Sequence, residues 1–234
     1  MVGYFSIINW GEITMNPEIE YKKIHEDIFN CSICNLISIR VHRVQPQWDE
    51  RKKPKSINKW AMIVGQAPGR TEYNLIRGNY NWRRINKTPF SGPAGKNLKK
   101  WFELEGVDYS SIFQNSFKTS IIKCYPGKSG SGDRKPTKTE INNCKPFLKR
   151  QLDIIKPKII IPIGKEATYW FLPFNTYEDK IGVLKFFENF KIVCLPHPSP
   201  ANLGFTKRKD IIKKIASSIQ IIGAEWRSYE SNRV

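Results

Sequence analysis

Four short apolar runs that alternate with helical stretches constrain the fold of this chain more than any other feature. The runs cover residues 61–64, 120–124, 159–163 and 191–195. Short continuous apolar runs bounded by turn residues are typical of strands buried on both faces of a sheet. Helical spacing of apolar residues, with Pro and Glu at the expected helix starts, predicts helices over residues 17–29, 95–103, 137–155 and 165–172. This order predicts an α/β fold with three layers, α/β/α, around a central four-stranded parallel sheet with right-handed crossovers.

The length of the chain fits one such unit. With 234 residues, 40% of them hydrophobic, the chain can bury one full α/β core. We expect a single domain over residues 16–234, preceded by a loosely ordered extension over residues 1–15, where no periodicity is strong. No apolar stretch approaches the roughly 20 residues that cross a bilayer, and the opening segment lacks a basic secretory n-region. The expected protein is therefore an intracellular, cytoplasmic monomer with no membrane partner.

The charge of the chain is strongly positive. It contains 39 Lys and Arg residues against 21 Asp and Glu residues, a formal net charge of +18. Such a field attracts phosphate backbones and raises the rate and affinity of their association. Nucleic acid is the partner that this charge favours, although a generally basic protein from a Lys-rich proteome would show the same excess.

Five cysteines favour a metal site over a disulfide framework. Cys31 and Cys34 form a C-x2-C pair, whereas Cys124 and Cys144 follow far along the chain. This pattern suits metal ligation in a reducing compartment. Four thiolates fit an iron–sulfur cluster or a structural zinc ion equally well on ligand chemistry alone. Cys194 lies inside a predicted strand, so we expect it to be a buried apolar residue.

Two loops follow predicted strands directly and are the best candidates for a functional site. Residues 65–69 read G-Q-A-P-G, and residues 195–200 read L-P-H-P-S-P. Loops at the carboxyl ends of parallel strands commonly carry the binding and catalytic residues of α/β proteins. Pro196 and Pro198 hold the backbone around His197 in an extended form, which fixes the direction of the imidazole.

These loops carry a family resemblance. Residues 65–69 followed by Glu72 look like the motif G-E-A-P-G-x-x-E, and residues 88–95 (T-P-F-S-G-P-A-G) look like R-P-F-V-G-x-A-G. Residues 197–200 are similar to an H-P-S motif. In this order, and with this spacing to the cysteines, the chain resembles the uracil-DNA glycosylase superfamily from Cys31 to Ala201. It is most similar to the fourth family, the iron–sulfur enzymes of prokaryotes.

Two departures from the family pattern bear on specificity. Gln66 stands where the fourth family usually has Glu, although other branches carry Gln. Ser120 stands where the family pattern T-N-V-V-K-C has an Asn that reads the base edge. A hydroxyl lacks the paired donor and acceptor of an amide. The resemblance therefore implies a substrate base that is uracil or a related deaminated base.

The resemblance implies a monofunctional DNA glycosylase of base excision repair, which hydrolyses the N-glycosidic bond of a flipped-out base without a Schiff base. Phe90 would stack on the flipped base, and His197 would donate a hydrogen bond to the departing pyrimidine O2. The implied catalytic residues are His197, Gln66 and Glu72. The implied base-binding residues are Gln66, Ala67, Phe90, Ser120 and His197. The implied DNA contacts are Ser91, Gly92, Pro198, Ser199, Pro200 and Leu203, with Leu203 as a possible wedge in the minor groove.

The resemblance also favours a structural 4Fe-4S cluster over zinc, with Cys31, Cys34, Cys124 and Cys144 as its ligands. Plainer interpretations stay open for several residues. Phe90 could be a core residue, and Glu72 could pair on the surface with Arg70 or Arg77. Two other functions compete with the enzyme: a nucleic-acid-binding protein of the same fold that has lost catalysis, and a hydrolase or transferase that acts on free nucleotides.

Overall fold

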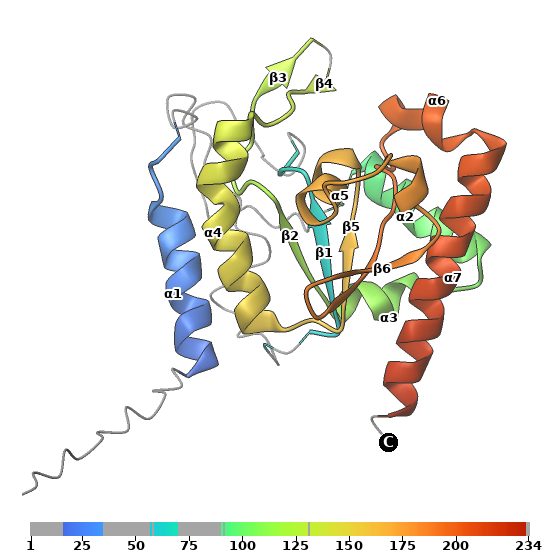
Figure 1. The fold of residues 1–234 in the computed structure, drawn as a ribbon, viewed down its shortest axis with the longest axis horizontal. Helices are drawn as coiled ribbons and strands as arrows, with labels where there is room; N and C mark the ends of the chain where they lie inside the picture. The colour runs from blue at the N-terminus through green and yellow to red at the C-terminus, as the bar shows by residue number, and fades with distance from the viewer. Residues whose placement is uncertain are drawn as a thin grey trace, which may run out of the picture.

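The computed structural model describes residues 16–34, 57, 59–69, 90, 92–130 and 132–232. In this part of the chain a central sheet lies between two layers of helices (Figure 1). The predicted α/β/α architecture is therefore confirmed. The helices and strands of the two halves of the chain contribute to the same sheet and the same two cores, one on each face.

The sheet has five strands in the order β2-β1-β5-β7-β6. Four of them are parallel: β2 (Ser116–Ser120), β1 (Ala61–Gly65), β5 (Ile159–Pro162) and β7 (Phe190–Val193). The fifth, β6 (Leu184–Phe187), pairs antiparallel with β7 at the edge. The predicted count of four strands is wrong because β6 is an edge strand. Its residues are half-buried or exposed, so it has no continuous buried run.

The second predicted strand is misplaced. The strand covers Ser116–Ser120, and the apolar residues Ile121 and Ile122 lie in the turn that follows it. All five residues of β2 are buried although most are polar, which is why apolar content pointed to residues 120–124 instead. Lys118 is one of them, and its ammonium lies 4.1 Å from the ring centroid of Phe113. Burial, followed by the charge of Lys59, lowers the pKa of Lys118 to about 7.

The helices divide between the two faces of the sheet. One face is covered by α1 (Pro17–Asn30), α4 (Lys138–Ile155) and α5 (Lys165–Phe171), and the other by α2 (Pro93–Leu104), α3 (Tyr109–Gln114) and α7 (Lys209–Ser231). Figure 1 shows α1 and α4 on one side and α7 on the other. The four predicted helices are confirmed, whereas α3 and the extent of α7 were not predicted. None of the described helices has the length and apolar character to cross a membrane.

The start of α4 is tied to a small hairpin. Thr137 and Glu140 form a capping box, in which each side chain accepts a hydrogen bond from the other residue's backbone N–H. The guanidinium of Arg134 donates to both carboxylate oxygens of Glu140 and to the carbonyl of Pro126. Arg134 directly follows the hairpin formed by β3 (Lys128–Ser129) and β4 (Gly132–Asp133). The Gly-rich stretch that begins at residue 127 thus contains an exposed, paired hairpin.

Candidate active site

Loops from four strands meet at the carboxyl edge of the parallel sheet. Gly65 at the end of β1 is in register with Ser120 at the end of β2, and Val64 is in register with Pro162 of β5. Pairing continues into the loops, since Ile121 N–H donates to the carbonyl of Gly65 at 2.9 Å. On the other side, the carbonyl of Leu195 after β7 accepts from the backbone N–H that follows β5. The two predicted functional loops therefore leave the same edge.

Phe90 is held over the end of β1. A Cβ placed on Gly65 would lie 3.7 Å from Cζ of the Phe90 ring, an ordinary contact distance. Phe90 has a positive φ of 63°, which non-glycine residues adopt rarely and which is found preferentially at functional sites. The first turn of α2 approaches this backbone so closely that a Cβ on Gly95 would lie 1.4 Å from the Phe90 carbonyl oxygen. The absence of a side chain at residue 95 is therefore what allows Phe90 its position.

His197 is seated on the neighbouring strand end. A Cβ on Gly164, which follows β5 and has a φ of 90°, would lie 3.2 Å from Cβ of His197. The backbone N–H of Ser199 donates to Nδ1 of His197 at 3.3 Å. Because Nδ1 accepts this bond, the proton of the neutral imidazole resides on Nε2. The ring is therefore fixed as an Nε2–H donor.

The backbone of the His197 loop is held by two asparagines. The side-chain amide of Asn202 donates to the carbonyl of His197 at 2.9 Å, and that of Asn97, on α2, donates to the carbonyl of Pro198 at 2.9 Å. The Asn97 bond joins the α2 layer to the loop after β7, 101 residues away in sequence. Neither asparagine was predicted. An asparagine inside a predicted helix, where its propensity is poor, draws attention to Asn97 but does not indicate its partner 101 residues away.

The electrostatic environment of His197 favours the neutral ring. Burial is the largest effect and lowers its pKa below the ordinary value of 6.5, while the negative charge of Asp133 partly opposes this shift. Asp133 belongs to β4, and its Oδ1 accepts a hydrogen bond from the Tyr125 hydroxyl at 2.9 Å. The β3–β4 hairpin thus contributes a fixed carboxylate to the field at His197.

Ser120 is buried, and its hydroxyl already has a backbone partner. Its Oγ donates to the carbonyl of Ile122 at 2.6 Å. Lys123, also buried, donates from Nζ to the carbonyl of Ser120 at 2.6 Å, to Oγ1 of Thr119 at 2.7 Å and to Oε1 of Gln151 at 2.8 Å. The structural role of this lysine was not predicted. It fixes the turn after β2 from beneath, and Ser120 keeps only the acceptor capacity of its oxygen for a ligand.

The remaining predicted residues of the first two motifs are placed in part. Gln66 and Ala67 are half-buried at the carboxyl end of β1. The carbonyl of Gln66 accepts from the backbone N–H of Ile122 at 3.3 Å, which orients the loop. Gly92 precedes α2, and its carbonyl accepts the first backbone bonds of that helix. Glu72 and Ser91 lie outside the described residues.

The third motif continues into a short 3-10 turn. The Oγ of Ser199 accepts from the backbone N–H of Ala201 at 3.1 Å and caps the turn Pro200–Asn202. Pro198 is buried and Pro200 is exposed. Leu203 begins the short helix α6 (Leu203–Thr206) with 39% of its surface exposed. A branched apolar side chain is thus presented to solvent one turn beyond the histidine.

Three of the four predicted ligand cysteines, Cys31, Cys34 and Cys144, lie near one another, and Cys124 lies in the turn after β2. Cys31 directly follows α1, and the Asn143 amide on α4 lies 3.4 Å from the sulfur of Cys34. Burial raises the pKa of the Cys144 thiol, and nearby Cys34 and Cys31 raise it further, whereas Lys123 lowers it. Within the described part of the chain, no three His, Cys, Asp or Glu side chains form a group that could hold a metal ion. Cys194 is fully buried, as predicted.

Comparisons with known proteins agree on one family. The model of the uracil DNA glycosylase superfamily matches residues 54–220. A type-4 uracil-DNA glycosylase of Sulfurisphaera tokodaii is 32% identical over 148 residues, which are 63% of this chain and 56% of that protein. One from Saccharolobus solfataricus is 30% identical over 188 residues, 76% of this chain and 75% of that protein. A type-5 uracil-DNA glycosylase of Pyrobaculum aerophilum is 24% identical over 204 residues, 80% and 86% of the two chains. The match thus spans little more than half of the first of these relatives.

Proposed function

Because the chain belongs to the uracil DNA glycosylase superfamily, we propose that it hydrolyses the N-glycosidic bond of uracil, or of a related deaminated base, flipped out of DNA. The observation that carries this proposal is the placement of Phe90 over Gly65 and of His197 over Gly164, at the ends of two adjacent strands. An aromatic face and an imidazole donor at one sheet edge are what the removal of a flipped base requires. The proposed role in the cell is base excision repair.

His197 is proposed as the catalytic hydrogen-bond donor. When the glycosidic bond breaks, the base departs with negative charge on its O2. The Nε2–H of a ring fixed by Ser199 would donate to this oxygen more strongly as its charge develops. A neutral donor is sufficient for this role, since no proton has to be transferred.

Phe90 and Gln66 are proposed to hold the base and the attacking water. The Phe90 ring would stack on the flipped base, with Ala67 and the oxygen of Ser120 along its edge. Gln66 lies at the end of β1 and could position water through its amide, together with Glu72. Since Ser120 supplies an acceptor and no amide pair, we propose that the edge of the base is read less strictly than by an asparagine.

The DNA backbone is proposed to lie across the same edge. Ser91, Gly92 and Ser199 would contact phosphates, and Pro198 and Pro200 would stiffen the loop that meets the minor groove. Leu203 would fill the space left by the extruded nucleotide.

A glycosylase panel tests this proposal. Duplexes that each contain a single uracil, hypoxanthine or xanthine are incubated with the protein, and abasic sites are detected by alkaline cleavage. We expect abasic product from uracil, with measurable product from a second deaminated base. The absence of product with all three bases, in a sample that still binds DNA, would support the non-catalytic alternative. Turnover of free nucleotides in place of DNA would support the nucleotide hydrolase.

Replacing Phe90 with alanine should weaken recognition of the flipped base. Base–aromatic stacking contributes about 1–3 kcal/mol, so we expect at least about a fivefold loss of affinity for a duplex with a non-hydrolysable deoxyuridine analogue. Binding to undamaged duplex should change much less, and fluorescence anisotropy measures both. Phe174→Ala is the matched control, because 80% of Phe174 is exposed. Equal losses on the two duplexes would identify Phe90 as a core residue.

The pH dependence of base release should carry no contribution from His197 above its ordinary pKa. Burial lowers the pKa of the ring below 6.5, so the neutral Nε2–H form already predominates when the pH rises through that value. Raising the pH further therefore removes no donor. Single-turnover rates over the range test this expectation, and a decline centred at or above 6.5 in the wild type that His197→Gln abolishes would contradict it.

A 4Fe-4S cluster on Cys31, Cys34, Cys124 and Cys144 is proposed as a structural group that ties α1 to α4. Thiolates are the ligands that such clusters require, and Cys31 and Cys34 lie close enough to Cys144 to raise the pKa of its thiol. Protein purified without oxygen is expected to be brown and to contain iron and sulfide, and Cys144→Ser should lose the colour and lower the unfolding temperature. A colourless sample that contains one zinc ion would overturn the assignment to iron. Cys194→Ser controls for the loss of a buried thiol.

A further inference from the structure

A cavity lies at the opposite edge of the sheet from the candidate active site. It has a volume of about 650 Å³ and is lined by residues that precede three of the parallel strands, among them Trp60, Lys158 and Asn189. The end of α7, with Ser228 and Tyr229, closes one side. Since the five residues of β1 rise about 3.3 Å each, the two edges are separated by roughly 16 Å of strand. A ligand here would not touch a base held at Phe90 and His197.

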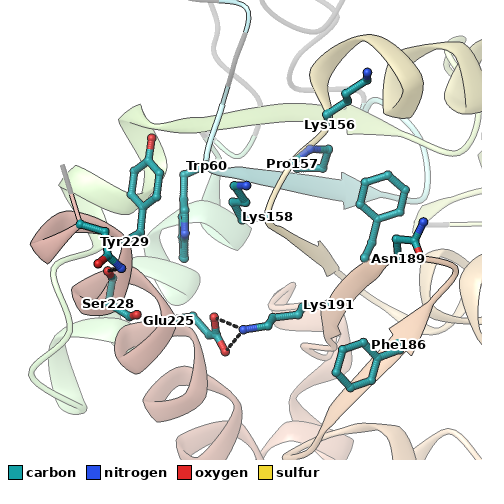
Figure 2. Close-up of a pocket in the computed structure, with 12 residues that line it drawn as sticks. Trp60, Lys156, Pro157, Lys158, Phe186, Asn189, Lys191, Glu225, Ser228 and Tyr229 are labelled. Carbon is teal, nitrogen blue, oxygen red and sulfur yellow. Dashed lines mark hydrogen bonds and ion pairs between the residues drawn. The ribbon is translucent and has the colours of Figure 1, made fainter.

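Aromatic side chains form the two sides of this cavity. In Figure 2, Trp60 and Tyr229 stand on one side and Phe186 on the other, with Lys158 between them. Trp60 is almost fully buried and packs edge-on against Trp226 with ring centroids 4.9 Å apart, so the wall that it forms is rigid. Phe186 is 63% exposed. Its ring offers an uncovered face to a planar ligand.

The charge of the cavity is positive. Three lysines and one glutamate line it. Lys191 is neutralised by Glu225, since its Nζ lies 2.8 Å from each carboxylate oxygen, as the dashed lines of Figure 2 show. Lys156 and Lys158 form no ion pair with any other described residue, and both are exposed. The cavity therefore presents two unneutralised ammonium groups beside aromatic faces.

We propose that this cavity binds an unpaired nucleotide of a single-stranded DNA segment, with its base against Phe186 or Tyr229 and its phosphates at Lys156 and Lys158. Stacking on aromatic rings beside a positively charged groove is how proteins hold single strands without reading their sequence. The formal charge of +18 favours a polyanion over a neutral aromatic ligand. The opposite edge would remain available for the deaminated base, so the protein would hold two segments of DNA at once.

Binding of uracil-free DNA tests this site separately from base removal. The probe is a fluorescein-labelled decamer of deoxythymidine, and anisotropy gives its affinity at fixed salt. We expect Lys156→Glu/Lys158→Glu to weaken binding about tenfold more than the control, because each new carboxylate faces a phosphate. The control is Lys185→Glu/Lys213→Glu, which changes the net charge equally at two exposed lysines outside the cavity lining. Equal losses in both variants would overturn the proposal, since only the overall charge would then matter.

Two further measurements locate the bound strand. Phe186→Ala keeps every charge and should lower the affinity for the decamer at least about fivefold. A decamer that carries 5-iododeoxyuridine should cross-link on irradiation to Phe186 or Tyr229, which peptide mapping identifies. Cross-links confined to the loops at the carboxyl edge, or thymidine monophosphate binding as tightly as the decamer, would overturn the proposal. Release of uracil from duplex by the Lys156→Glu/Lys158→Glu variant should match the wild type, which separates this site from the proposed enzyme activity.

Discussion

Replacing His197 with alanine should slow base release by about 10²–10³-fold, the loss typical of a single oxyanion donor. The imidazole is held by the backbone N–H of Ser199 on one nitrogen and rests on Gly164, so its Nε2–H is directed before a substrate arrives. Removing the ring removes this donor at the moment when charge develops on the departing base. Single-turnover release of uracil from duplex, at saturating protein, measures the chemical step.

Binding to DNA separates this role from a structural one. His197→Ala should bind a duplex with a non-hydrolysable analogue within about twofold of wild type, because the stacking and phosphate contacts persist. His197→Gln, whose side-chain amide also donates, should recover part of the rate. If alanine at residue 197 leaves the single-turnover rate unchanged, the donor must be a different group. A loss of binding equal to the loss of rate would place the histidine in ground-state recognition.

Gly95→Ala should lower the rate of base release by about 10²-fold, as much as a displacement of about 1 Å in a catalytic group costs. The added Cβ would have to occupy a point 1.4 Å from the carbonyl oxygen of Phe90 and 2.5 Å from its carbonyl carbon. Neither atom belongs to a side chain that can rotate away, so the first turn of α2 or the Phe90 backbone must shift. Since Asn97 of the same helix holds the His197 loop, the shift would affect both rings of the site.

Stability measurements complete this test. We expect the overpacked variant to unfold with about 1–3 kcal/mol less free energy than wild type while it keeps its secondary structure. Gly132→Ala is the control, because a Cβ there meets no atom within 4 Å. If Gly95→Ala retains full activity and unchanged stability, α2 does not approach the Phe90 backbone as closely as described above.

The sequence predicts the architecture well where apolar residues are continuous. β1 and β5 are fully buried and β7 is buried in its second half, and each strand was placed to within two residues at either end. β2 shows the limit of this reasoning. Its Lys118 and Thr119 are buried by tertiary packing against Phe113 and Gln151. No pattern in the neighbouring sequence predicts these partners. β6 was missed for a different reason: it is only four residues long, and Lys185 interrupts its apolar residues.

The candidate site follows the same division. The loops that carry Gln66 and His197 could be predicted because they directly follow strands, and parallel strands place such loops at one edge. The residues that orient these loops could not be predicted. Asn97 reaches the His197 loop across 101 residues, and Lys123 reaches Gln151 on α4 across 28. These contacts depend on how the helix layers pack on the sheet. The spacing of residues along the chain does not reveal that packing.

The two glycines beneath the rings differ in what they permit. Under Phe90, a methyl group on Gly65 would only reach ordinary van der Waals distance, and Gly65 has no positive φ. Under His197, Gly164 combines a left-handed backbone with a tighter approach of 3.2 Å. Gly65 can therefore accept a methyl side chain, whereas Gly164 cannot. A change in the size of the accepted base, through natural divergence or protein engineering, can therefore start at Gly65, beneath the Phe90 ring, without moving the hydrogen-bond donor His197.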